Sequence, residues 1–182
     1  MNFIALDFET AHADFPCEIG LSRVENGSIK ETKSWLIKPG CFPYMNPWNQ
    51  KVHRISSNQV ASSQTFEELW PELKDWVADS VMVAHNAAFD MRVLRSALAY
   101  YELALPWAEY FCSVNLSRKV WKQLPSHSLS TVSQFHNIEF NHHRAGDDAK
   151  ACAIIALKAF ESLEANSLED GLTKIGIALK KL

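Results

Sequence analysis

The chain has 182 residues, of which 47% are hydrophobic and 21% charged, and its formal net charge is −3. This length and composition predict one folded domain with a sizeable core, and no apolar run approaches the roughly 18 residues of a transmembrane helix. A negative net charge argues against a protein that wraps nucleic acid by bulk electrostatics, but it is compatible with phosphate contacts made through bound cations.

The N-terminus and the cysteines favour a cytoplasmic protein. The first ten residues, MNFIALDFET, lack the basic start of a signal peptide and meet an acid at position 7. Cys17, Cys41, Cys112 and Cys152 are scattered along the chain and form no CxxC pair. That spacing is typical of reduced thiols rather than of a disulfide framework or a zinc site. We expect no membrane partner.

The first third of the chain predicts an antiparallel meander. Residues 3–8, FIALDF, are short and apolar, as in a central strand. Two strand-like arms at 18–24 and 29–37 flank an Asn-Gly pair at 26–27, which favours a type I′ hairpin turn. Residues 38–64 contain three prolines and little periodicity, so they predict an ordered loop region.

The remaining two thirds alternate helices and strands. A capping box at 65–68 precedes apolar residues at helical spacing, which predicts a helix there. Short apolar runs predict a strand at 81–84 and another in YFCSVNL, 110–116, that runs into a helix. Further helices are expected at 88–103, 128–138 and 148–165, with a short last helix in the tail.

This order of elements predicts an α/β fold. Its mixed central sheet would hold the antiparallel meander first and parallel strands after it, flanked by helices. We expect one main domain over residues 1–165, with residues 166–182 forming a helical tail packed on the same domain.

Asp7 and Glu9 form the first candidate site. Residues i and i+2 of a strand point to the same face, so the two carboxylates are neighbours and repel each other. A proton or a cation must compensate, and Mg²⁺ or Mn²⁺ does so well because hard cations prefer carboxylate oxygen. A solvated edge strand is the simpler reading, but the apolar neighbours Phe3, Ile4 and Leu6 make an exposed edge unfavourable.

Asp90 is the second candidate. It follows the predicted strand 81–84 and the turn at His85 and Asn86, in the first turn of a predicted helix. Functional sites of α/β sheets gather at such carboxyl ends of strands. The alternative reading is structural, because an aspartate in a first helical turn complements the helix dipole.

The third candidate is the run NHHRAGDDAKA, residues 141–151. A catalytic site could take from this segment one carboxylate as a metal ligand and one imidazole as general base. A histidine pKa of about 6.5 suits proton transfer from water. A capped helix start with solvated side chains is the alternative. Spacing does not select the pair, because His142 to Asp147 and His143 to Asp148 each have four residues between them.

Taken in order, D-x-E-T at 7–10, H-N-x-x-F-D at 85–90 and H-R-A-x-x-D-A at 143–149 resemble the three exonuclease motifs of the DEDDh, or DnaQ-like, family. The resemblance covers roughly residues 3–160 and implies a ribonuclease H-like fold with two divalent cations, Mg²⁺ or Mn²⁺. It implies that His143 is the general base. The small residue after the last acid selects Asp148 over Asp147, so the implied metal-binding acids are Asp7, Glu9, Asp90 and Asp148.

The same resemblance implies substrate contacts. Thr10 matches a threonine whose backbone approaches the terminal nucleotide, and Asn86 and Phe89 match positions that line the cleft. Phe8 lies between the two acids, although its side chain is expected to pack in the core. His53 is a weaker candidate contact, in a His-Arg-Ile sequence where many relatives have His-Gly-Ile, which puts a positive φ at that middle position in doubt.

The function implied by the resemblance is metal-dependent 3′–5′ exonuclease activity that releases nucleoside 5′-monophosphates, with single-stranded DNA as the favoured substrate. The expected partners are a nucleic acid with a 3′ end, DNA rather than RNA, and a DNA polymerase or another replication or repair protein. Two alternatives stay open. One is an exoribonuclease, since the sequence assigns no contact to a 2′-hydroxyl, and the other is a non-catalytic module that binds 3′ ends beside a polymerase.

Overall fold

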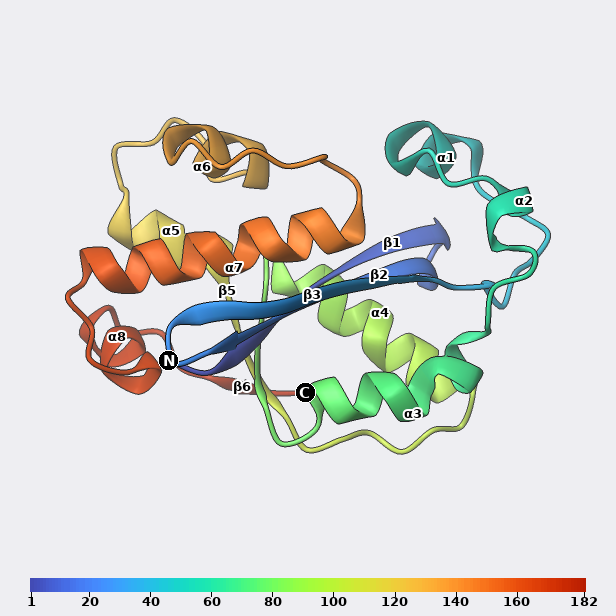
Figure 1. Ribbon diagram of the computed structural model, residues 1–182, viewed down its shortest axis with the longest axis horizontal. Coiled ribbons are helices and arrows are strands. Elements are labelled where there is room, and N and C mark those ends of the chain that lie inside the picture. Colours follow the sequence, from blue (N-terminus) through green and yellow to red (C-terminus); the bar gives the residue numbers. More distant parts are fainter.

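Six strands form one mixed sheet in the order β3-β2-β1-β4-β5-β6. The computed structural model describes residues 1–182 and places helices on both faces of this sheet (Figure 1). The strands are β1 (Phe3–His12), β2 (Phe15–Glu25), β3 (Ser28–Leu36), β4 (Val81–Ala84), β5 (Glu109–Cys112) and β6 (Lys180–Lys181).

The predicted meander is confirmed. β1, β2 and β3 pair antiparallel, and Asn26 and Gly27 at the hairpin have φ values of 53° and 73°, as a type I′ turn requires. β4 pairs parallel with β1, and β5 pairs parallel with β4, which confirms the mixed sheet. β2 starts at Phe15, earlier than the predicted arm, because the turn after β1 takes only two residues.

Eight helices complete the fold, and the prediction of a loop over residues 38–64 was wrong. Two short helices lie there, and Asn46 caps the first of them by accepting hydrogen bonds from the next turn, with proline at the first helical position. Helices this short show no periodicity in sequence. The helices are α1 (Pro47–His53), α2 (Ser57–Val60), α3 (Phe66–Val77), α4 (Ala87–Tyr100), α5 (Ser113–Val120), α6 (Leu129–Phe135), α7 (Ala145–Ser162) and α8 (Leu168–Lys174).

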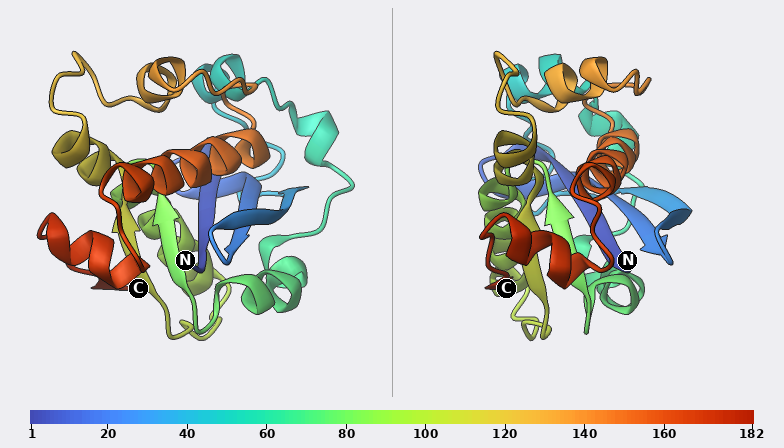
Figure 2. Two further views of the ribbon diagram at one scale, coloured as in Figure 1. Left: turned by 60° about the vertical axis from the view of Figure 1, so that its left-hand side comes forward. Right: turned by 90° about the vertical axis from the view of Figure 1, so that its left-hand side faces the viewer.

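The two faces of the sheet carry separate cores. On β1, Ile4, Leu6 and Phe8 pack with α3 and α4, whereas Phe3 and Ala5 pack on the other face with α5, α6 and α7. This alternation sends Asp7 and Glu9 to the face that α7 covers. In Figure 2, α1 and α6 lie at one end of the strands and both chain termini lie at the other.

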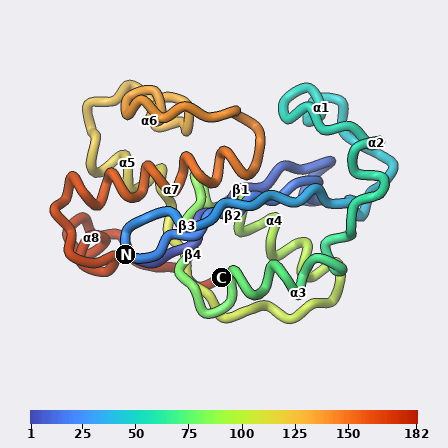
Figure 3. Tube along the Cα trace, in the orientation of Figure 1, coloured from blue at the N-terminus to red at the C-terminus, as the bar shows by residue number.

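The connection from β3 to α3 lies beyond the carboxyl end of β1, as the tube trace shows (Figure 3). α1 in this connection contacts β1. Arg54 ends α1 with a left-handed φ of 62°, so the positive φ exists although the residue is not glycine. None of the helices combines the length and the apolar run that crossing a membrane would need.

The C-terminal segment packs on the same sheet and adds a strand that the sequence did not predict. Leu172 of α8 joins the core beneath α7, and β6 pairs antiparallel with β5. The Leu182 N–H also donates to the Ala108 carbonyl. Two residues are too short a strand for a periodic signal in sequence, so only the neighbouring edge of β5 defines it.

Gly20 decides how closely α7 approaches the sheet. It pairs with Asp7 across β1 and β2, and a Cβ there would collide with the Ala145 carbonyl at the start of α7. The absence of a side chain therefore lets the first turn of α7 lie directly on the sheet beside Asp7.

Gly20→Ala should destabilise the protein by about 1–3 kcal/mol or more, because the added methyl must displace backbone rather than a flexible side chain. Urea unfolding followed by circular dichroism measures the change. Gly146→Ala is the matched control and should cost less, since its Cβ would meet chiefly the Ser34 side chain. An equal loss in both variants would contradict the role given to Gly20.

Candidate active site

Four acids from three elements converge beside the middle of β1, just beyond the carboxyl end of β4. Asp7 and Glu9 come from the strand, Asp90 from the first turn of α4 and Asp148 from the first turn of α7. Carboxylate oxygens of Asp7, Glu9 and Asp148 lie within 4.8 Å of one another. Asp90 lies outside that group but close enough to raise the pKa of Asp7.

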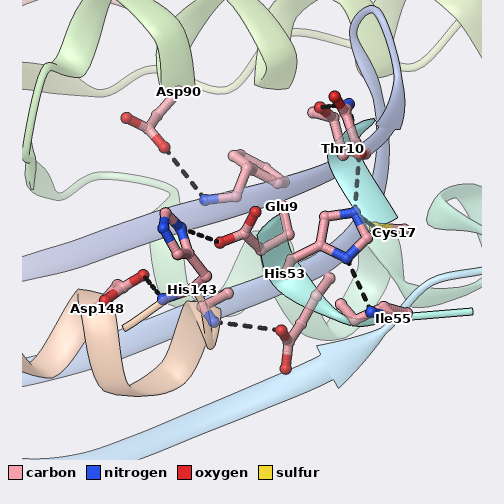
Figure 4. Close-up of polar contacts among 12 residues, drawn as sticks. Glu9, Thr10, Cys17, His53, Ile55, Asp90, His143 and Asp148 are labelled. Atoms are coloured by element: carbon pink, nitrogen blue, oxygen red, sulfur yellow. Dashed lines mark hydrogen bonds and ion pairs between the residues drawn. The ribbon is translucent and has the colours of Figure 1, made fainter. Parts of the chain in front are cut away.

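A tight turn places Asp90. β4 ends at Ala84 and α4 begins at Ala87, and Asn86 makes the turn with a left-handed φ of 76°. The Phe8 N–H of β1 then donates to Asp90 Oδ1 over 3.1 Å, shown as a dashed line in Figure 4. This bond uses a β1 backbone group between the two strand acids and fixes the Asp90 carboxyl against the strand.

The two candidate aspartates of α7, Asp147 and Asp148, have different surroundings in the structure. The carboxylate of Asp148 is buried, and its Oδ2 accepts a 2.9 Å hydrogen bond from the backbone N–H of His143. Asp147 instead bonds Asn141 at 2.9 Å, away from the carboxylate group. The choice of Asp148 over Asp147 therefore agrees with the geometry of the cluster.

The His143 ring lies close to Glu9 and Asp148. The residue has a left-handed φ of 66°, and its Nδ1 lies 3.7 Å from Glu9 Oε1, as Figure 4 shows. Its ring also stacks on His142, with centroids 3.9 Å apart. Both imidazoles lie near Asp148, but the contact with Glu9 belongs to His143.

Burial and mutual repulsion raise the pKa values of the four carboxyls. The pKa of Asp7 lies well above its ordinary range because of burial first and the charges of Asp90 and Asp148 next. Burial, followed by the Asp148 charge, raises the pKa of Glu9 to about 8. Burial is also the main cause that raises the pKa values of Asp90 and Asp148 to about 7.

The donor set fits a hard divalent cation. Three carboxylates offer oxygen atoms to one point, and Asp148 Oδ1 is buried without any hydrogen-bond partner. A buried polar atom without a hydrogen-bond partner destabilises the folded state. Asp148 Oδ1 is therefore available as a ligand atom for a cation. A cation there would also offset the repulsion among the acids.

An open cleft with a volume of about 640 Å³ exposes this cluster. Asn86 and Phe89, the predicted cleft residues, line it, as does Val52 of α1. The Phe8 side chain is 3% exposed and packs in the core. At the site Phe8 therefore contributes its backbone N–H rather than its ring.

Thr10 and His53 lie where β1 contacts α1, and neither side chain lines the cleft. The Thr10 carbonyl accepts from Asn49 Nδ2 at 3.0 Å and lies 3.3 Å from His53 Nε2. The Ile55 N–H donates to His53 Nδ1, which leaves Nε2 as the protonated nitrogen that donates to Thr10 (Figure 4). His53 is 2% exposed, so it holds Thr10 and does not face the cleft.

Sequence reasoning missed Glu18. This acid is 1% exposed, and it accepts from Arg144 Nη2 at 3.0 Å and from the Ala145 N–H at 3.2 Å. It therefore anchors the start of α7, three residues before Asp148. An acid inside the apolar run of β2 was the available signal, but its partners lie 126 and 127 residues away.

His85 is a second missed residue. Its Nδ1 lies 2.8 Å from Ser113 Oγ and its Nε2 lies 2.9 Å from the His127 carbonyl. The ring thus ties the end of β4 to α5 and to the loop before α6, which form one side of the cleft. Burial lowers its pKa to about 4, so the ring is neutral at pH 7.

One family model and several known proteins are similar to this chain in sequence. An exonuclease family model, RNase_T, matches residues 4–156. The chain is 31% identical to a PolC-type DNA polymerase III of Thermotoga maritima over 96% of its own length, but it spans only 13% of that protein. It is 29% identical to the DNA polymerase III epsilon subunit of Aquifex aeolicus, covering 89% of this chain and 82% of that subunit.

Solved structures share the fold. Exonuclease X in complex with 5′ overhanging duplex DNA superposes with a TM-score of 0.76 at 24% identity, over 92% of this chain and 96% of that one. The zinc-bound complex of E. coli ExoI with single-stranded DNA gives a TM-score of 0.77 at 18% identity, and the match covers 95% of this chain and 43% of that chain. Together with the family match, these similarities identify the chain as a member of the DnaQ-like, DEDDh exonuclease family with a ribonuclease H-like fold.

Proposed function

We propose that the chain is a metal-dependent 3′–5′ exonuclease that hydrolyses the terminal phosphodiester bond of single-stranded DNA and releases nucleoside 5′-monophosphates. The observation that carries this proposal is the group formed by two half-buried carboxylates, Asp7 and Glu9, and the buried Asp148, whose Oδ1 has no hydrogen-bond partner, at the base of an open cleft. Membership of the exonuclease family supports the reaction class, and the epsilon and PolC-type relatives support DNA and a polymerase as partners.

Asp7, Glu9 and Asp148, with Asp90 beside them, would hold two divalent cations, Mg²⁺ or Mn²⁺. When bound, such ions neutralise phosphate charge and lower the pKa of water. His143 faces Glu9 from the mouth of the cleft, and burial lowers its pKa, so the ring is neutral at pH 7 and accepts the proton of the attacking water. Thr10, Asn86 and Phe89 would position the terminal nucleotide.

Two features argue against a non-catalytic module that only binds 3′ ends. First, all five predicted catalytic positions hold residues of the types that the reaction needs. Second, the carboxylates repel one another and would also repel a negatively charged nucleic acid, so they do not favour binding without a cation. RNA shares the phosphodiester chemistry, so the first assay compares both nucleic acids.

Asp7→Asn should abolish turnover while leaving the fold intact, because the change keeps the shape of the side chain and removes one repelling charge. The assay uses single-stranded DNA and RNA labelled at the 5′ end, each with Mg²⁺, Mn²⁺ or EDTA. The wild type should give a metal-dependent ladder that shortens from the 3′ end. A folded wild-type protein that shortens neither strand would contradict the proposed function.

His143→Ala should lower kcat by roughly 10²–10⁴-fold, the usual contribution of a general base. His142→Ala is the matched control, since it removes the stacked neighbour without the contact to Glu9. A larger loss in His142→Ala than in His143→Ala would move the role of base to His142.

Glu9→Gln should stabilise the metal-free protein at about pH 9 but not at about pH 5. The folded-state pKa of about 8 lies above the ordinary 4.5, so the native state holds this proton more tightly than the unfolded chain. That stability is present below pH 4.5 and is lost as the pH rises through 8.

Thermal melts in EDTA measure the difference between Glu9→Gln and the wild type, which cancels the titration of the groups that Glu9 does not affect. A gain of several degrees is expected, since 1 kcal/mol corresponds to roughly 2–4 °C at this size. Saturating Mg²⁺ should remove the gain. Equal melting differences at both pH values would show that Glu9 does not carry the repulsion.

A further inference from the structure

A second groove lies beside the active-site cleft, between α4, α5, β5 and the C-terminal segment. Its volume is about 610 Å³. The start of α4 supplies Ala87 and Ala88, α5 supplies Arg118 and Lys119, and the tail supplies Lys180. None of the catalytic acids lines it.

The groove adjoins the cleft. Asn86, Val114 and Arg118 line both, so α5 forms a shared rim between them. The opposite end of the cleft is bounded by α1, where Asn49 and His53 bond the Thr10 carbonyl. A polymer whose terminal unit lies over the acids can therefore leave the cleft along α5 and enter the groove.

The charges of the two surfaces are opposite. Arg118, Lys119 and Lys180 line the groove without any carboxylate among the lining residues, and none of the three forms an ion pair. The whole chain carries a net charge of −3, so three unpaired cations in one groove are a local exception. Such a surface suits a polyanion whose end enters an acidic, cation-binding centre.

The wall that carries Lys180 is a fixed part of the fold. Tyr110 pairs with Lys180 across β5 and β6, and Arg95 Nη2 donates to the Lys181 carbonyl at 3.1 Å. The Arg95 guanidinium also lies 5.8 Å from the centre of the Tyr110 ring. Lys180 is therefore held at the groove by backbone pairing rather than by a mobile terminus.

We propose that this groove binds the sugar-phosphate backbone of the single strand on the 5′ side of the nucleotide being removed, through Arg118, Lys119 and Lys180. The C-terminal segment thereby serves as one wall of a strand-binding channel. The inference rests on the proposed exonuclease function for the position of the 3′ end, but the groove itself is tested separately by binding.

The test uses the full chain and the double variant Lys119→Ala/Lys180→Ala, which spares Arg118 because that residue also lines the cleft. The control is Lys30→Ala/Lys74→Ala, which removes the same charge from exposed sites outside both cavities. Two substrates are compared: single strands of about twelve nucleotides, as DNA and as RNA, and the p-nitrophenyl ester of thymidine 5′-monophosphate, which is too short to reach the groove.

The groove variant should raise KM for the long strand roughly tenfold at low salt with kcat retained, and it should affect the ester far less. The dependence of log KM on log salt should become shallower by about 1.4, because each phosphate contact on a single strand contributes about 0.7. An unchanged KM, a change equal to that of the control pair, or an equal loss on the ester would overturn the proposal.

Fluorescence anisotropy of the labelled strand in EDTA separates this proposal from the proposed function. If the wild type hydrolyses neither substrate but loses strand affinity in the groove variant only, the groove stands and the exonuclease function fails. If hydrolysis is normal and the groove variant binds like the wild type, the function stands and the groove fails.

Discussion

The close contact between α7 and the sheet at Gly20 is the constraint on which the site depends. Gly20 lies opposite Asp7, and the start of α7 rests on it with no room for a side chain. Glu18, two residues earlier on β2, binds Arg144 and the Ala145 N–H and so fixes the same turn. Together they bring Asp148, from the far end of the sequence, to within 4.8 Å of acids on the first strand.

This arrangement works against the stability of the metal-free protein. Two buried carboxyls, Asp90 and Asp148, lie close to the half-buried Asp7 and Glu9, and desolvation and mutual repulsion raise all four pKa values. A fold selected for stability alone would place apolar side chains there. The scaffold tolerates the acids because hydrogen bonds hold two of them, from Phe8 N–H to Asp90 and from His143 N–H to Asp148. The repulsion that remains among the carboxylates is the term that a bound cation would reduce.

An acidic surface and a basic surface adjoin each other on the molecule. The cleft holds carboxylates beside the middle of β1, whereas the adjoining groove holds unpaired cations on α5 and β6. In the proposed function a nucleic acid strand would use both, because cations held by the carboxylates would act on its 3′-terminal phosphodiester bond and the basic side chains would contact its other phosphates. The two surfaces share Asn86, Val114 and Arg118 among their lining residues.

The order of the main elements, the mixed sheet and the three acidic motifs could all be predicted from the amino-acid sequence. These are local properties: the alternation in FIALDFET, the Asn-Gly turn and the capping box at Thr65 are each decided by neighbouring residues. Sequence alone did not reveal α1, α2 or β6, because short elements carry no periodic signal and are held by distant backbone partners.

How the acids come together, and which groups hydrogen-bond to them, depends on packing between remote segments and could not be predicted. Spacing left His142–Asp147 and His143–Asp148 equivalent and the family resemblance favoured the second pair; in the structure Asp148, and not Asp147, lies beside Asp7 and Glu9. Glu18 and His85 were invisible as site residues because their partners are far away in sequence. Residue types and local pattern reveal which chemistry is available, but distances between remote segments, set by packing, decide where it takes place.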